Sequence, residues 1–139
     1  MAVQMLFQSD LGGSPLPQIF DSFDPANQTE GSGRAGSQAA AYEYGKSLVR
    51  GTLEHRDEID GLIREQAEHW RLERMPVVDR NILRLAVYEF LYETDVPKLV
   101  VLDEAIELAK RFGSEQSGRF VNGLLDGLLK RREFPGRMK

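Results

Sequence analysis

Apolar positions recur three or four residues apart through most of the chain, which is the spacing of an amphipathic helix. One run covers residues 42–53 and a second covers residues 59–70, with a break expected near His55. No alternating strand pattern of useful length and no internal repeat is visible. The pattern therefore predicts an all-α protein.

The segment 77–92 is apolar around most of a helix circumference, which is typical of a central, buried helix. Pro76 stands just before it, at a position suited to a first helical turn. Its remaining polar stripe carries Arg80 and Arg84, one turn apart, followed by Tyr88.

Two further helices are predicted after Pro97. The first covers residues 99–112 and is expected to stop at Gly113, since glycine tolerates a left-handed cap. Ser114 is then expected to cap a final helix that ends in three basic residues at 130–132. Three glycines inside this helix are expected to let neighbouring helices approach closely: Gly118, Gly123 and Gly127.

The first part of the chain differs in character. Residues 1–9 resemble the end of a helix, whereas residues 10–36 are rich in glycine and proline and predict a loop or insert. Residues 27–37, which include the end of that insert, are expected to be flexible.

The composition narrows the functional class. A chain of 139 residues suits one domain, and the absence of cysteine excludes disulfides and thiolate metal sites. No apolar run reaches the length of a membrane span and no signal-peptide pattern is present, so we expect a soluble, cytoplasmic protein. The net charge of −4 is unusual for a nucleic-acid binder, although it fits a protein that presents an acidic face to a basic partner.

The sequence offers no catalytic constellation. His55 and His69 are fourteen residues apart, too far for a helical metal site, and are interpreted as solvated side chains. The abundant carboxylates, Asp60 and Glu107 among them, are interpreted as solvated helix faces. We expect no enzyme activity, no metal and no cofactor.

Two clusters invite a binding function. The first is the stripe of Arg80, Arg84 and Tyr88, whose arginines alternatively serve the structure by pairing with acids such as Asp79 or Glu89. The second is the turn 113–120, where basic residues at 110, 111 and 119 surround an amide and an aromatic ring. Such a rim can hold single-stranded RNA, although the aromatic Phe120 also fits the apolar core stripe.

The stretch DRNILRLAVYEFLYETDVPKLVVLDEAIELAKRFGSEQSGRFVNGLLDGLL, residues 79–129, resembles the C-terminal half of the NusB family. An arginine pair, YE, DVP, EAIELAK, FG and FVNG occur in order at the family's spacing, and AVQMLFQSD resembles the end of the family's first helix. The resemblance implies a single domain, residues 1–139, of about seven helices. Two packed subdomains are expected, with helices in residues 38–70 and 76–132.

The resemblance also implies a function. NusB proteins bind the boxA element of ribosomal RNA leader transcripts together with NusE, a ribosomal protein of the small subunit, and act in the RNA polymerase antitermination complex. Carried over by position, Gln4, Phe7, Arg80, Arg84, Gln116 and Phe120 are the expected RNA-binding residues. Asn122 of FVNG is expected to be a buried amide.

One departure from the family pattern concerns the start of the chain. Family members carry an arginine-rich run before AVQ that contacts RNA, whereas Met1 falls after that run here. Either the coding sequence begins further upstream or this protein lacks the run; we expect an upstream, in-frame extension that encodes several arginines.

Two alternative functions remain open from the sequence. One is an RNA-targeting domain like the NusB-like domain of ribosomal-RNA cytosine methyltransferases. The other is a structural helical dimer that binds no RNA.

Overall fold

The computed structural model describes residues 35–68 and 71–139, with side chains from residue 43 onward. This part of the chain holds five α-helices, one short 3-10 helix and no strand: α3 (Ala35–Glu54), α4 (Arg56–Gln66), η2 (Leu72–Arg74), α5 (Val77–Tyr92), α6 (Lys98–Phe112) and α7 (Glu115–Arg131). The prediction of an all-α fold is confirmed. The helix end expected in residues 1–9 and most of the predicted insert, residues 10–36, lie outside the described residues.

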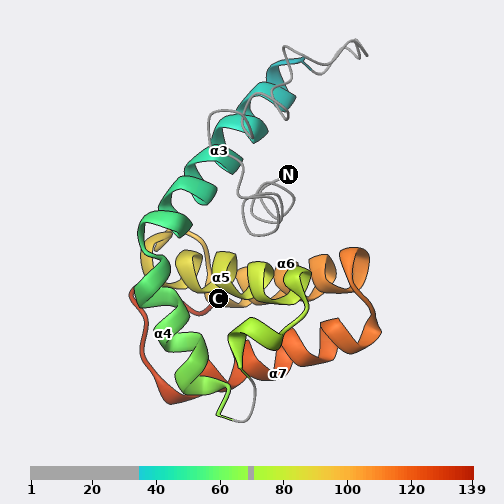
Figure 1. Cartoon of the computed structure of the whole chain (residues 1–139). Helices are drawn as coiled ribbons and strands as arrows, with labels where there is room; N and C mark the ends of the chain where they lie inside the picture. The colour runs from blue at the N-terminus through green and yellow to red at the C-terminus, as the bar shows by residue number, and fades with distance from the viewer. Residues whose placement is uncertain (1–34, 69–70) are drawn as a thin grey trace.

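Helix α5 is the centre of the molecule, as its apolar circumference predicted. It contacts α3, α4, α6 and α7 (Figure 1). Ten of its 16 residues are buried, and Leu83, Val87 and Phe90 are completely inaccessible. Pro76, predicted for the first helical turn, occupies the N-cap position directly before that turn, where its carbonyl oxygen accepts a hydrogen bond from the Arg80 amide at 3.0 Å.

Helices α3 and α4 meet at the predicted break, because His55 alone separates them. Helix α3 rises away from the other helices, and α4 turns back along α5 (Figure 1). The pattern predicted helix through residue 70, but α4 ends at Gln66. Helix α3 begins at Ala35, inside the segment predicted to be flexible.

Helices α6 and α7 form a tight hairpin around Gly113 and Ser114. The Ser114 hydroxyl accepts a hydrogen bond from the Ser117 amide at 3.1 Å, which confirms the predicted cap. The left-handed cap predicted at Gly113 is wrong, because its φ is −115°. Glycine is needed there for space, since a Cβ would lie 2.5 Å from the Ser117 hydroxyl and 2.8 Å from the Ala109 carbonyl oxygen.

Two of the three glycines within α7 lie where a side chain of another helix approaches the α7 backbone closely. A Cβ at Gly118 would lie 2.8 Å from Cγ of Lys110 on α6, and one at Gly127 would lie 2.5 Å from the Gln66 amide on α4. The expectation is wrong for Gly123, which is exposed and has no atom within 4 Å of such a Cβ.

The C-terminal residues return to the start of α6. The carbonyl oxygens of Arg137 and Met138 accept hydrogen bonds from the amides of Lys98 and Leu99 at 3.1 and 2.9 Å. These bonds satisfy two amides of the first turn, for which Pro97 at the cap position offers no side-chain acceptor. The tail thereby helps to bury Lys98, which is 1% exposed; this burial lowers the pKa of its amine.

Candidate RNA and partner interface

The first turns of α5 and α7 meet at one end of the helical body. Asp79 in the first turn of α5 is 3% exposed and lies beside Ser117, which is itself buried in the first turn of α7. Burial raises the pKa of the Asp79 carboxyl, and the neighbouring Ser117 side chain opposes that shift. The contact fixes two helix starts beside each other although they are far apart in the sequence.

Arg80, Gln116 and Phe120 are brought to this junction. Arg80 follows Asp79 and is half-buried, with its Nη1 donating to the Glu73 carbonyl oxygen at 3.4 Å. Gln116 precedes Ser117 and is exposed, whereas Phe120 is half-buried against the core. The structure therefore places three of the predicted RNA-binding residues on two adjoining helix starts.

Arg84 has a different environment from Arg80. Its side chain is 5% exposed, and its Nε and Nη2 donate to the two carboxylate oxygens of Asp60 at 2.8 and 3.1 Å. Its Nη1 donates to the Asn81 side chain at 3.1 Å. This placement favours the structural alternative for Arg84 over direct RNA contact, with Asp60 as its partner in place of Asp79 or Glu89.

The interpretation of Asp60 as part of a solvated carboxylate face is therefore wrong. Its side chain is 6% exposed and accepts two hydrogen bonds from Arg84. The only sequence signal was its position between Ile59 and Leu62, both of which are buried. An isolated acid beside an apolar stripe needs a partner when the stripe packs, and α5 supplies it.

Tyr88, the third member of the predicted stripe, belongs to an aromatic cluster with His55 and Tyr92. Its ring packs over Gly51, where it leaves no room for a Cβ. His55 stacks on Tyr92 with ring centroids 4.2 Å apart, and Tyr88 lies 5.3 Å from Tyr92. His55 is thus part of an aromatic surface instead of a freely solvated side chain; His69 lies outside the described residues.

Basic side chains surround the α6–α7 turn as predicted. Lys110, Arg111 and Arg119 are all exposed. The guanidinium of Arg111 lies over the Phe112 ring at 5.4 Å, and the stem of Lys110 packs against Gly118. These contacts hold two cations at the α6–α7 turn without burying their charges.

Asn122 and the N-terminal candidates complete the predicted set. Asn122 is exposed, so the expectation of a buried amide is wrong. Its position falls on the outer face of α7, between the buried Val121 and Leu124. Gln4 and Phe7 lie outside the described residues.

A hollow that the sequence pattern does not predict lies between α3, α5 and α6. It has an apolar floor and two carboxylates, Glu89 and Glu104, with Tyr44 at its side. Burial, reinforced by the nearby carboxylates of Glu104 and Glu93, raises the pKa of Glu89 to about 7, against a lowering hydrogen bond from Tyr44. The sequence predicts for Glu89 only a pairing with arginine, because its neighbours on α3 and α6 cannot be read from the local pattern.

Neither a metal site nor a membrane span appears among the described residues. Residues 35–68 and 71–139 contain no group of three metal-ligating side chains. Over the same ranges, every helix is too short or too polar to cross a bilayer.

Solved structures share this fold. The chain aligns with T. maritima NusB at a TM-score of 0.78 and 41% identity, covering 94% of this chain and 87% of that one. It aligns equally well, at a TM-score of 0.78 and 29% identity, with a chain from a crystal structure of the antitermination factors NusB and NusE in complex with dsRNA. That alignment covers 94% of this chain and 92% of the other.

Sequence comparison points to the same family. The transcription antitermination protein NusB of Sorangium cellulosum (strain So ce56) is 46% identical over 129 residues, which are 93% of this chain and 86% of the relative. A protein of the same name from Desulforamulus reducens is 45% identical, over 95% of this chain and 87% of its own length. The family model described as NusB matches residues 1–130, and the chain therefore belongs to the NusB family.

Proposed function

We propose that this protein is a transcription antitermination factor that binds boxA RNA of ribosomal RNA leader transcripts as a complex with NusE. The observation that carries the proposal is its likeness to the NusB chain solved with NusE and dsRNA, over 94% of the present chain. Within the RNA polymerase antitermination complex, the protein would act by binding; its relatives are named as antitermination proteins.

The proposed RNA surface is the junction of α5 and α7. Arg80, Gln116 and Phe120 lie on its two helix starts, and Gln4 and Phe7 are proposed to join them from the N-terminal segment. Cations from Lys110 and Arg119 are available for phosphate, and the partly accessible Phe120 ring is available for base stacking. Arg84 is not proposed as an RNA ligand, because its guanidinium is buried against Asp60.

A basic partner is needed for physical reasons. The chain carries a net charge of −4, so its overall field attracts RNA poorly. A ribosomal protein with positive charge would offset that field and bind beside the RNA. We therefore expect RNA and NusE to bind cooperatively to one continuous surface.

Paired titrations test the proposal. RNA affinity is measured with and without NusE, and NusE affinity with and without RNA; the two factors must be equal if the ligands are coupled. Arg80→Ala should weaken the ternary complex while the helical circular-dichroism spectrum stays unchanged, and Lys139→Ala serves as its control. Equal RNA affinity with and without NusE would exclude the shared surface.

Two further measurements separate the alternatives. The boxA strand is compared with its duplex, because the related complex contains dsRNA. Gel filtration of the free protein detects a homodimer. A dimer with no affinity for either RNA would favour the purely structural role, whereas RNA binding that NusE leaves unchanged would favour an RNA-targeting domain of the methyltransferase kind.

A further inference from the structure

An arginine-lined hollow lies between α4, η2 and α5. Its wall is formed by four arginines, two acids and one leucine: Arg56, Asp60, Arg64, Leu72, Glu73, Arg80 and Arg84. Four guanidinium groups against two carboxylates leave it with a local excess of positive charge, although the whole chain carries −4. Its volume of about 360 Å³ leaves room for a phosphate group with its hydrating waters.

The charged side chains in the inner layer of the hollow are paired with one another. Asp60 and Arg84 neutralise one another with side chains 6% and 5% exposed, and Arg56 approaches the same carboxylate at 3.5 Å. The Asp60 charge is thereby compensated before any ligand arrives, so it opposes an incoming anion only weakly.

The outer layer of the hollow is more exposed to solvent. Arg56 and Arg64 are 48% and 54% exposed, and Arg80 is half-buried. The single exposed acid of the lining is Glu73, at 67%. Its carboxylate accepts from Arg64 at 3.0 Å, while its backbone carbonyl oxygen accepts from Arg80 at 3.4 Å.

We propose that this hollow binds a phosphate group of the RNA backbone, with Arg64 and Arg80 as its principal ligands. The proposal rests on the proposed function, and it extends the RNA surface from the α5–α7 junction to α4 and η2. Guanidinium groups bind phosphate oxygens through two parallel hydrogen bonds, a geometry that suits two arginines on adjoining elements. In the free protein, the Glu73 carboxylate accepts the hydrogen bond that Arg64 would otherwise donate to the phosphate.

Exchange of Glu73 for phosphate is physically easy. An ion pair between two exposed side chains contributes little to stability, because water and salt screen it. Glu73 lies in a three-residue 3-10 helix at the surface, so its side chain can turn to solvent without disturbing a core contact. A backbone phosphodiester carries the same single negative charge, so it can take the place of the Glu73 carboxylate without an added charge penalty.

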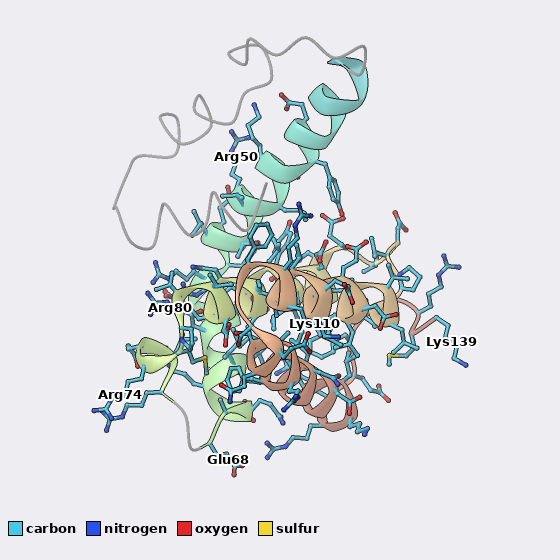
Figure 2. The ribbon with its side chains drawn as sticks, turned by 90° about the vertical axis from the view of Figure 1, so that its right-hand side faces the viewer. Arg50, Glu68, Arg74, Arg80, Lys110 and Lys139 are labelled. Atoms are coloured by element: carbon cyan, nitrogen blue, oxygen red, sulfur yellow. The ribbon has the colours of Figure 1, made fainter. Side chains whose placement is uncertain are left out.

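The placement of the hollow supports this extension. Arg80 belongs both to the hollow and to the α5–α7 junction, so one RNA strand can contact both. Figure 2 shows Arg80 and Arg74 at one end of the molecule and Lys139 at the opposite end. Lys139 therefore offers a matched control cation away from the proposed path.

Two substitutions that each remove one charge, with opposite expected effects, test the proposal. Glu73→Gln removes the internal competitor and should tighten binding of boxA RNA about two- to fivefold, whereas Arg64→Gln should weaken it by a similar factor. Arg64→Gln should also reduce the salt dependence of binding by about 0.7 logarithmic units of slope, the value of one single-strand phosphate contact. The controls, Glu133→Gln and Lys139→Gln, change the same charges at the C-terminus and should leave affinity and slope unchanged.

A second readout is independent of RNA function. Inorganic pyrophosphate is titrated into the isotope-labelled protein, and the arginine Nε–H signals are followed by NMR. Shifts of the Arg64 and Arg80 signals that saturate at lower pyrophosphate concentration in Glu73→Gln support the phosphate site.

The outcomes separate the two proposals. If RNA binds but all four substitutions leave its affinity equal, the hollow is not part of the RNA path and this inference is overturned while the proposed function stands. If no RNA binds with or without NusE, the proposed function fails, and the pyrophosphate titration decides whether the hollow is a phosphate site. Absence of any arginine shift overturns the site itself.

Discussion

Arg84 and Asp60 form a bidentate ion pair in the interior, between the central helix α5 and helix α4. The two bonds measure 2.8 and 3.1 Å, and the residues are 24 positions apart in the sequence. Both charges are removed from water, so each depends on the other for its stability. The pair ties α4 to α5 beneath the surface on which Arg80 lies.

Removing one member of this pair should destabilise the fold strongly. Arg84→Ala leaves the buried Asp60 carboxylate with only the half-exposed Arg56, at 3.5 Å, as a counter-charge, and we expect a loss of about 3–5 kcal/mol in the free energy of unfolding. Urea denaturation at neutral pH measures it. The double variant Asp60→Leu with Arg84→Met should recover much of the loss, because neither charge remains buried. A loss for Arg84→Ala below about 1 kcal/mol would instead assign Arg84 to the surface.

Leu124 on α7 provides the apolar comparison. It is 7% exposed within the core, so Leu124→Ala should cost about 2–5 kcal/mol through lost burial and the cavity left behind. Asn122→Ala, two residues earlier on the exposed face of the same helix, should change stability by less than about 0.5 kcal/mol. Similar losses in the two variants would contradict the placement of α7.

Stability should depend on pH through Glu89. Folding raises the pKa of this carboxyl from its ordinary 4.5 to about 7, so the folded chain holds the proton more tightly than the unfolded chain. The free energy of unfolding should therefore decrease as pH rises from about 4.5 to about 7, by at most about 3 kcal/mol, and the contribution should stay constant above.

Glu89→Gln should flatten this part of the profile and stabilise the protein at pH 8. Denaturant unfolding at a series of pH values compares it with Glu107→Gln, an exposed carboxyl on α6. A profile that Glu89→Gln leaves as steep as that of the unsubstituted protein would show that other groups produce the pH dependence.

The Ser114 cap should contribute measurably to the α6–α7 hairpin. Ser114→Ala removes the acceptor of the Ser117 amide and should cost about 0.5–2 kcal/mol. Ser114→Asp retains a capping oxygen and should preserve most of the stability. If alanine and aspartate are equally destabilising in thermal melts, the hydroxyl cap does not stabilise the turn.

A negative charge at Gln116 should weaken RNA binding. Gln116 is exposed at the start of α7, so Gln116→Glu adds a charge that repels phosphate without changing the side-chain length. We expect a two- to fivefold loss of affinity at low salt that diminishes as salt screens the added charge. Asn122→Asp, on another face of α7, is the control in fluorescence-anisotropy titrations. Equal effects would indicate a general charge response instead of a local contact.

Much of the fold follows from local sequence. The apolar circumference of residues 77–92 predicted a central helix, and Ser114 predicted the start of α7, because burial stripes and caps involve residues three or four positions apart. The same local information predicted the break at His55. It also selected Arg80, Gln116 and Phe120, which the structure brings to two adjoining helix starts.

The roles of individual charges required the tertiary structure. Arg80 and Arg84 are one turn apart and look alike in the sequence, and both line the same hollow. Yet Arg80 is half-buried, whereas Arg84 is buried and paired with Asp60. No local pattern distinguishes Arg56, Arg64 and Glu73 as binding residues, because the hollow that they line forms only where α4, η2 and α5 meet. A charged side chain takes its function from the partners that folding places around it, and those partners lie on other elements.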